Sequence, residues 1–322
     1  MLNSRSSAAA LLVALSLPWC AASGQTPLVD HHQHLSSPAN SDAAGAPSER
    51  RLPSSARTLI AFLDSAGIRR AVVLSVAYQW GGYSRTTENE YEKVKAENDW
   101  TAQQVALYPD RLIAFCSVNP IKPYALNEIA RCARDPRLRA GLKLHFGNSD
   151  VDVHDSTQVA QLQRVFRAGD ANRMPIIAHL HANYNKRRPY GGPEARIFLE
   201  RILPFAPHVI VQIAHLAGAG GFDNVTDSAS AVYAAAIAAH DPRTAHLYFD
   251  VSGISGIEEM EPARKSRLVR RMRQIGFDRL LYGSDGAVPG FGPREYWASF
   301  KTLPLTPTEV NALATNVAPY LR

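Results

Sequence analysis

The stretch Leu28-Val-Asp-His-His-Gln-His-Leu35 sets the interpretation of the rest of the chain. Its apolar start, which follows a proline, predicts a short buried strand. Side chains two residues apart share one face of a strand, so His32 and His34 point to one side and His31 to the other. Two imidazoles at this spacing can reach one metal ion. The alternative is a pair of solvated histidines at a strand end, without a role.

Short apolar runs alternate with helical patterns along the 322 residues. The apolar runs, which predict strands buried on both faces, cover residues 28–34, 71–76, 111–118, 140–146, 175–180, 209–214, 245–251 and 279–284. The helical patterns cover residues 54–66, 88–107, 123–134, 156–168, 193–203, 229–239, 262–275 and 293–301, with a final helix over 307–321. Residues 36–53 are predicted to form a loop. Eight strand–helix units predict an α/β fold, a closed (β/α)8 TIM barrel. The alternative, a doubly wound open sheet, more often has a glycine-rich loop after its first strand.

The N-terminus has the pattern of a secretory signal peptide. Arg5 precedes an apolar run over residues 8–17 and small residues over 21–24. The run is too short to cross a bilayer as a permanent anchor. We therefore expect residues 1–24 to be a signal peptide and residues 25–322 to form one barrel domain. The protein is expected to be exported, either to the periplasm or as a secreted protein.

The composition is that of an ordinary globular protein, with 46% hydrophobic and 20% charged residues. The formal charge of +6 is spread along the chain, apart from a basic cluster over residues 264–273 that predicts a solvated helix face. No basic motif interleaved with aromatic residues accompanies it, so a nucleic-acid partner is not expected. The two cysteines left after cleavage are too few for a disulfide framework. We expect Cys116 to be a small buried hydrophobe.

Polar side chains that can bind metal or carry protons follow most of the predicted strands. In a barrel of this kind, catalytic groups lie at the carboxyl ends of the strands. Such groups end the first and the fourth to eighth strands: His32, His34, Lys143, His145, His179, His181, His215, Asp250 and Asp285. Each has a structural alternative when taken singly; an aspartate in Gly-Ser-Asp-Gly, for example, often forms a turn. As a set that meets at one barrel mouth, they predict a metal site.

The ordered motifs resemble the amidohydrolase superfamily. Within it they are similar to the amidohydrolase-related (amidohydrolase 2) branch, which includes the aminocarboxymuconate-semialdehyde decarboxylase-like proteins. The matching stretches span nearly all of the mature chain and are Val29-Asp-His-His-Gln-His34, Tyr108-Pro-Asp-Arg-Leu-Ile-Ala114, Gly141-Leu-Lys-Leu-His145, Pro175-Ile-Ile-Ala-His179, Ile213-Ala-His-Leu-Ala-Gly218 and Leu281-Tyr-Gly-Ser-Asp285. The histidine pair alone is weak evidence, whereas the ordered set is specific.

The resemblance implies one divalent metal bound by His32, His34, His179 and Asp285. Zinc suits neutral imidazoles with a carboxylate, and manganese is the alternative. Such a metal lowers the pKa of its bound water and polarises a substrate carbonyl. We expect Asp285 to be the general base and His215 to orient the water or stabilise the oxyanion.

Lys143 lies at about the place where a carboxylated lysine bridges two metals in binuclear relatives. The resembling branch is usually mononuclear, so we expect one metal, with Lys143, His145 and His181 in the substrate pocket. An internal ion pair is the alternative for Lys143.

Three functions would use this site differently. We expect foremost the hydrolysis of an amide, ester or lactone bond in a small molecule. The second is non-oxidative decarboxylation of a small carboxylic acid, and the third is a non-catalytic binding protein on the same barrel. The presence of all expected ligands argues against the third, and export favours hydrolysis over decarboxylation. The resemblance is compatible with a homodimer, and the loops carry no pattern that identifies the substrate.

Overall fold

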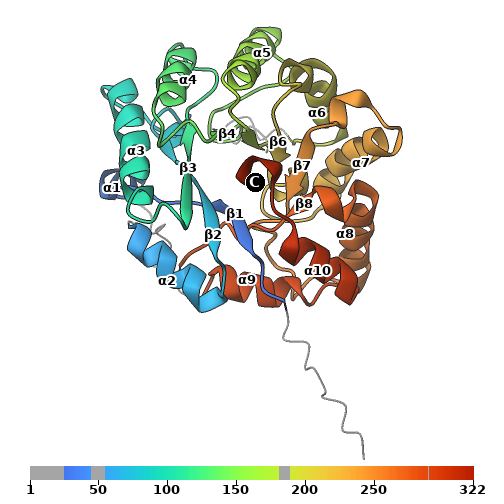
Figure 1. Ribbon diagram of the computed structural model, residues 1–322. Helices are drawn as coiled ribbons and strands as arrows, with labels where there is room; N and C mark the ends of the chain where they lie inside the picture. Colours follow the sequence, from blue (N-terminus) through green and yellow to red (C-terminus); the bar gives the residue numbers. More distant parts are fainter. Residues whose placement is uncertain (1–24, 45–54, 181–188, 289) are drawn as a thin grey trace, which may run out of the picture.

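The computed structural model describes residues 25–44, 55–180, 189–288 and 290–322, and within these ranges eight parallel strands follow one another in a single sheet. The strands are β1 (Val29–Gln33), β2 (Arg70–Leu74), β3 (Leu112–Ser117), β4 (Leu142–His145), β5 (Ile176–His179), β6 (Val211–Ile213), β7 (Leu247–Asp250) and β8 (Leu280–Leu281). The strands form a ring with the helices outside it, so the predicted TIM barrel is confirmed (Figure 1). The predicted signal peptide lies outside the described residues.

Hydrogen bonds between the last strand and the first close the ring. The backbone N–H of His31 donates to the carbonyl of Tyr282 at 2.9 Å. Just beyond β8, the backbone N–H of Asp285 donates to the carbonyl of His32, also at 2.9 Å. The histidine motif and the aspartate motif, which are far apart in sequence, therefore lie side by side.

Helices lie between and after the strands, and most of them lie close to the predicted ranges. They are α1 (Pro38–Ala44), α2 (Ala56–Ala66), α3 (Glu90–Val105), α4 (Ala125–Arg134), α5 (Ser156–Ala171), α6 (Gly192–Ile197), α7 (Asn224–Ala238), α8 (Pro262–Ile275), α9 (Pro293–Phe300) and α10 (Pro307–Thr315). Ser55 caps α2 by accepting a hydrogen bond from the backbone N–H of Thr58 at 3.2 Å. Gly67 ends α2 with φ of 71°, a left-handed conformation that glycine adopts without strain.

Four segments differ from the sequence-based prediction. Helix α7 begins at Asn224, five residues before the expected start, because Asp223 caps it by accepting a hydrogen bond from the N–H of Thr226. Helix α6 ends at Ile197, where a short π-helix (Phe198–Ile202) takes the place of the rest of the predicted α-helix.

Part of the loop expected over residues 36–53 is helix α1, in which Ser37 accepts a hydrogen bond from the N–H of Asn40 at 3.1 Å and a proline occupies the first helical position. The last helix was expected to reach residue 321, but it ends at Thr315 and a short 3-10 turn (Pro319–Leu321) follows. Pro319 disfavours a helical conformation at the residue before it, which separates the two segments.

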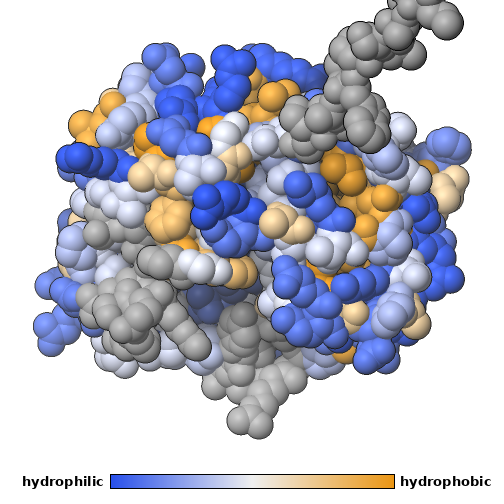
Figure 2. Space-filling view, turned by 90° about the horizontal axis from the view of Figure 1, so that it is seen from below, coloured by the Kyte–Doolittle hydropathy of each residue, from blue (hydrophilic) through white to orange (hydrophobic). Residues whose placement is uncertain are grey.

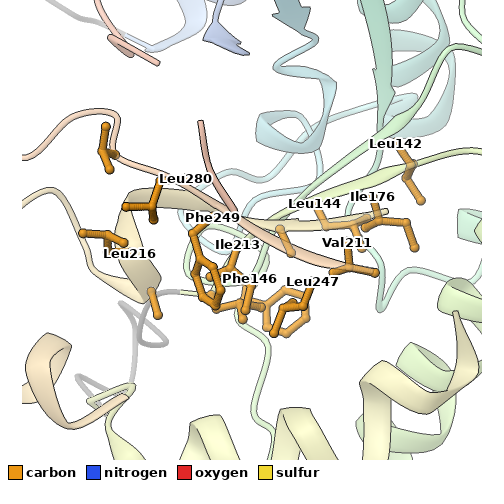
Figure 3. Close-up of a cluster of buried hydrophobic side chains, with 14 of the residues drawn as sticks. Leu142, Leu144, Phe146, Ile176, Val211, Ile213, Leu216, Leu247, Phe249 and Leu280 are labelled. Carbon is orange, nitrogen blue, oxygen red and sulfur yellow. The ribbon is translucent and has the colours of Figure 1, made fainter. Parts of the chain in front are cut away.

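The main hydrophobic core lies between the strands and the helices. Leu142 and Leu144 of β4 and Phe249 of β7 belong to it, together with inward-facing residues of the helices (Figure 3). Because side chains alternate along a strand, Lys143 and Gln212 point the other way, into the barrel. The strands are thus apolar on the outside of the barrel, while polar groups enter its interior.

A smaller apolar cluster fills part of the barrel interior. Val72, Leu74, Phe115 and Ile177 form it, and they come from β2, β3 and β5, so they meet across the barrel axis. The C-terminal turn completes the cluster, because the ring of Tyr320 lies 5.4 Å from that of Phe115. The C-terminus accordingly lies over the middle of the ring in Figure 1.

Cys116 of β3 and Cys132 of α4 form a disulfide. Both residues are fully buried, so the expected burial of Cys116 is confirmed, whereas its pairing with Cys132 was not predicted. The two cysteines are 16 residues apart, and the chain brings them together by returning along β3 as α4. That proximity depends on the packing of the helix against the strand.

Figure 2 shows hydrophobic residues in small separate groups among hydrophilic ones on one side of the barrel. Among the residues described, no helix is both long and apolar enough to cross a membrane.

Candidate functional site

Three of the four predicted metal ligands meet at the barrel mouth. Nε2 of His34 lies 3.3 Å and Nε2 of His32 lies 3.7 Å from Oδ1 of Asp285. His32 and His34 are buried, whereas the Asp285 side chain is partly exposed at the mouth. Two nitrogen donors and one oxygen donor therefore converge on one point, within reach of a single ion.

The second nitrogen of each of these imidazoles is held by an acceptor. Nδ1 of His34 lies 2.7 Å from the carbonyl oxygen of Leu74, and Nδ1 of His32 lies 3.0 Å from Oδ2 of Asp250. A carbonyl and an ionised carboxylate only accept, so both rings carry their proton on Nδ1 and present the Nε2 lone pair to the site. This is the arrangement that metal-binding histidines have in proteins, and these donors fit zinc or manganese.

The fourth predicted ligand, His179, lies outside this group of three. Its Nδ1 is 3.1 Å from Nε2 of His215, and its ring stacks on that of His145 with centroids 4.1 Å apart. His215 lies between His179 and Asp285, with Nε2 3.9 Å from Oδ2 of the carboxylate. Nδ1 of His215 is 2.8 Å from the carbonyl oxygen of Ser252, so its Nε2 also carries the lone pair.

The backbone at two of these residues is strained. His215, Leu216 and Ala217 follow one another with positive φ values of 54°, 51° and 68°, and Asp285 has φ of 57°. Non-glycine residues in this left-handed region cost about 1–3 kcal/mol each and are concentrated at functional sites. The turn ends β6 abruptly and points the His215 ring across the mouth.

Lys143 and His145 both reach this site from β4. Lys143 is fully buried, and its Nζ lies 3.1 Å from Nε2 of His32. Burial lowers the pKa of Lys143 to about 8, although Asp285 and Asp250 oppose that effect. A metal on Nε2 of His32 would require this amine to turn away from the nitrogen.

Neighbouring groups decide the charge states at the mouth. Burial and the nearby Lys143 lower the pKa of His32 to about 4, so this imidazole is neutral at pH 7, as a metal ligand must be. Burial alone would raise the pKa of Asp285, but His32, His34 and His215 outweigh burial and hold that pKa below its usual range. Asp285 is therefore an ionised carboxylate at neutral pH.

His145 lies beside these ligands, next to the ring of Tyr78 at 4.9 Å. Burial and the charge of Lys143 hold its pKa well below the ordinary value. His181, the remaining residue predicted for the substrate pocket, lies outside the described residues.

Three buried polar residues, Asp250, Gln212 and Ser252, lie next to the predicted site residues and hold them by hydrogen bonds. The sequence analysis noted only Asp250. Asp250, which was noted as a strand end, accepts hydrogen bonds from Gln212 Nε2 at 2.7 Å and from the backbone N–H of His215 at 3.0 Å. The hydroxyl of Ser252 also donates to Asp250, at 2.6 Å. Gln212 lies in the middle of an apolar strand and Ser252 in a loop, so no sequence pattern marked either residue.

A second carboxylate, that of Asp30, ties β1 to the segment after β8. It accepts hydrogen bonds from Ser284 Oγ at 2.6 Å, from the Ser284 backbone N–H at 3.1 Å and from Gln33 Nε2 at 2.8 Å. Burial raises the pKa of Asp30 to about 6, although these donors oppose it. This network fixes the position of Asp285, which directly follows Ser284.

Similar solved structures have the same fold. One is a 5-carboxyvanillate decarboxylase from Sphingomonas paucimobilis, with 16% identity and a TM-score of 0.64 over 90% of this chain and 96% of that one. A 5-carboxyvanillate decarboxylase from Novosphingobium aromaticivorans, complexed with manganese and 4-hydroxy-3-methoxy-5-nitrobenzoic acid, has 14% identity and a TM-score of 0.57 over 90% and 94%. A probable 2-pyrone-4,6-dicarboxylic acid hydrolase from Acinetobacter baumannii, with citric acid bound, has 16% identity and a TM-score of 0.55 over 91% and 97%.

Identities this low establish only a common fold, and a comparison with curated proteins gives no match. The family model described as Amidohydrolase matches residues 29–316. The match begins with β1 and continues past the last strand, so it includes every motif at the barrel mouth. The chain therefore belongs to the amidohydrolase family, in its amidohydrolase 2 branch.

Proposed function

We propose that the protein is an enzyme that depends on one divalent metal and acts on a small carboxylic acid. The observation that carries this proposal is the convergence of His32 Nε2, His34 Nε2 and Asp285 Oδ1 with both Nδ1 atoms held by acceptors. When bound, zinc or manganese supplies Lewis-acid polarisation and a water of lowered pKa. Zinc suits these nitrogen and oxygen donors. Manganese is the alternative, because a similar solved structure contains it.

The residues around this point suit an anionic substrate. Lys143 supplies a buried positive charge beside the predicted metal ligands, and the stacked rings of His145 and His179 line the mouth. Asp285 and His215 form the pair that can hold or move a proton, since His215 Nε2 lies 3.9 Å from Oδ2 of the carboxylate. We assign proton transfer to this pair and substrate binding to Lys143 and His145.

Non-oxidative decarboxylation is the reaction that we propose first, which reverses the order favoured by the sequence. The bond between a carbon atom and its carboxylate breaks, carbon dioxide leaves, and the electron pair stays on the carbon. That carbon then takes a proton. His215 can deliver it from Nε2 after that nitrogen has taken up a proton from solvent, and the ionised Asp285 beside it stabilises the charged ring in the meantime. Two of the three similar solved structures described above are decarboxylases, and this likeness supports the assignment.

Hydrolysis of a lactone or ester that carries a carboxylate is the second candidate. It is favoured by the same proton-transfer pair, because ionised Asp285 can accept a proton from an attacking water while His215 orients that water. A similar solved structure is a probable hydrolase of a dicarboxylic lactone. In this reaction the acyl C–O bond breaks and the alkoxide leaving group takes up the proton.

Metal analysis combined with product analysis tests the proposal. The purified protein should carry about one zinc or manganese per chain, and the variant His32→Ala/His34→Ala should lose it. His208→Ala is the matched control, because His208 is exposed and pairs with Asp170 away from the mouth. Release of carbon dioxide from hydroxylated aromatic dicarboxylic acids would support decarboxylation, and acid release from lactones would support hydrolysis. A chain that stays free of metal after reconstitution would refute the proposed function.

We also propose that the enzyme is exported. The N-terminal pattern supports this, and so does the buried Cys116–Cys132 disulfide, because structural disulfides persist in oxidising compartments. Fractionation of cells that express the full chain, with mass spectrometry of the mature N-terminus, tests export. A protein that begins near Gln25 in the periplasm or medium is the expected result.

A further inference from the structure

A polar cavity of about 440 Å³ lies among the loops that follow β1, β2 and β4. Among the residues that the structure describes, it is lined by Ala43, Gln79, Gly82, Ser84, Arg85 and Asn148. The backbone N–H of Asn148 donates to Nδ1 of His145 at 3.2 Å, so the cavity adjoins the mouth on the side of His145. Tyr78, which precedes Gln79 in the chain, lies against the same imidazole.

The side chain of Arg85 donates its hydrogen bonds in this cavity to a neutral residue, and the nearby carboxylate of Glu97 attracts its charge. Its guanidinium lies 5.0 Å from the centre of the Trp80 ring and donates to Oδ1 of Asn40 at 2.7 Å. Among the residues described, its hydrogen bonds go to Asn40 alone. A guanidinium has five N–H donors in a planar fork that matches a carboxylate, so several donors remain for a ligand.

We propose that this cavity binds a second carboxylate of the substrate and that Arg85 recognises it. The inference rests on the proposed function and narrows the substrate to a small acid with two or more carboxyl groups. One group lies at the metal centre above Lys143, and the other pairs with Arg85. Ser84 and Gln79 add polar side chains to the same cavity.

Calorimetric titration of the metal-loaded protein with isophthalate and benzoate, which differ by one carboxylate, tests this subsite. Arg85→Met should weaken isophthalate binding about tenfold or more and change benzoate binding little, since a charge-assisted hydrogen bond is lost. Lys93→Met is the matched control, because Lys93 lies over the same Trp80 ring at 5.1 Å without lining the cavity.

The outcomes separate this subsite from the proposed function. An equal loss for both acids in Arg85→Met, or no isophthalate binding to the unaltered protein, would overturn the subsite. Titration of the metal-free His32→Ala/His34→Ala variant keeps the two questions distinct. Binding of isophthalate there that still depends on Arg85 would support the subsite even if the metal proposal fails.

A separate observation concerns the C-terminal turn (Pro319–Leu321), which packs against the apolar cluster inside the barrel. The hydroxyl of Tyr320 donates to Oε1 of Gln212 at 2.7 Å. Nε2 of Gln212 donates to Oδ2 of Asp250 at 2.7 Å, and the same oxygen lies 3.0 Å from Nδ1 of His32. One chain of hydrogen bonds thus joins a residue two positions from the C-terminus to a predicted metal ligand.

The direction of each hydrogen bond in this chain is set. Asp250 only accepts, so Gln212 must turn its amide nitrogen towards Asp250 and its oxygen towards Tyr320. Both Gln212 and Asp250 are fully buried, where a polar group without a partner is costly. Loss of the tyrosine hydroxyl therefore leaves the buried amide oxygen of Gln212 without its donor, so the Gln212 side chain is held less firmly against Asp250.

We infer that Tyr320 is a positioning residue for the metal centre, acting on His32 through Gln212 and Asp250. Tyr320→Phe should weaken zinc affinity about threefold to tenfold, less than loss of a direct partner of a ligand, which costs about tenfold to a hundredfold. Competition with a chromogenic chelator measures this affinity without any activity assay.

Two further variants distinguish positioning from general stability. Leu321→Ala removes neighbouring C-terminal packing and should lower the melting temperature while leaving zinc affinity unchanged. In a Gln212→Leu background the relay is already broken, so Tyr320→Phe should add no further loss of affinity. Unchanged affinity in Tyr320→Phe, or the same loss in both backgrounds, would overturn the inference.

Discussion

Replacement of Asp250 by asparagine is the sharpest test of how this metal centre is built. The carboxylate is fully buried and accepts five hydrogen bonds, two on Oδ2 and three on Oδ1. The donors are His32 Nδ1, Gln212 Nε2, the backbone N–H groups of His215 and Ser252, and the hydroxyl of Ser252. An asparagine of the same shape keeps one oxygen and turns an NH2 group towards the other donors.

Both orientations of that amide have a cost. Each leaves at least two buried donors without an acceptor, at about 1–3 kcal/mol each, so we expect Asp250→Asn to lower the free energy of unfolding by about 2–6 kcal/mol. If the NH2 group faces His32, that ring must move its proton to Nε2, and the lone pair no longer faces the site. Zinc affinity should then fall about tenfold to a hundredfold.

Urea unfolding and chelator competition measure these two quantities on the same preparation. Glu128→Gln is the matched control, because Glu128 is also a fully buried carboxylate with Asn98 and Arg131 as donors, away from the mouth. It should destabilise the protein without changing zinc affinity. Unchanged affinity in Asp250→Asn, beside a control that behaves as described, would refute the assignment of Asp250 as the support of His32.

Three further predictions concern the barrel itself. Gly141→Ala places a Cβ about 2.1 Å from the Phe115 ring, so overpacking should lower stability by about 1–3 kcal/mol in urea unfolding. Reduction of the Cys116–Cys132 disulfide should cost about 3 kcal/mol for a loop of this length, and a melting temperature unchanged by reductant would contradict it. Burial lowers the pKa of His31 to about 4, so the unfolded chain binds the extra proton first as the pH falls. This contribution to stability is present above about pH 6.5 and should be lost towards pH 4, by about 3 kcal/mol, with a shallower loss in His31→Gln.

Much of the site followed from the sequence because barrel topology places strand ends together. Once eight strands are recognised, His32, His34 and Asp285 must share one mouth, and the structure places them within reach of a single ion. The α2 boundaries were also predictable, since Ser55 and Gly67 act through local hydrogen bonding and backbone conformation. The extent of the last helix was overestimated because the effect of Pro319 on the preceding residue was not taken into account.

Other features depend on contacts between residues far apart in sequence. The relation of His179 to His215, the left-handed turn at His215 and the support of Asp250 by Gln212 have no local pattern. The same applies to the disulfide, because two cysteines in a sequence do not reveal that a helix returns along its strand.

The sequence by itself thus determined the barrel, the mouth at which function lies and the donor types that face it, because strand and helix periodicity and side-chain chemistry are local properties. Only the tertiary structure decided which nitrogen of each histidine faces the site and that His179 lies outside the group of three predicted ligands. It also decided that Tyr320 of the C-terminal turn is connected to this site by hydrogen bonds. These depend on hydrogen bonds that form only when distant segments are packed together and water is excluded, so no local pattern encodes them.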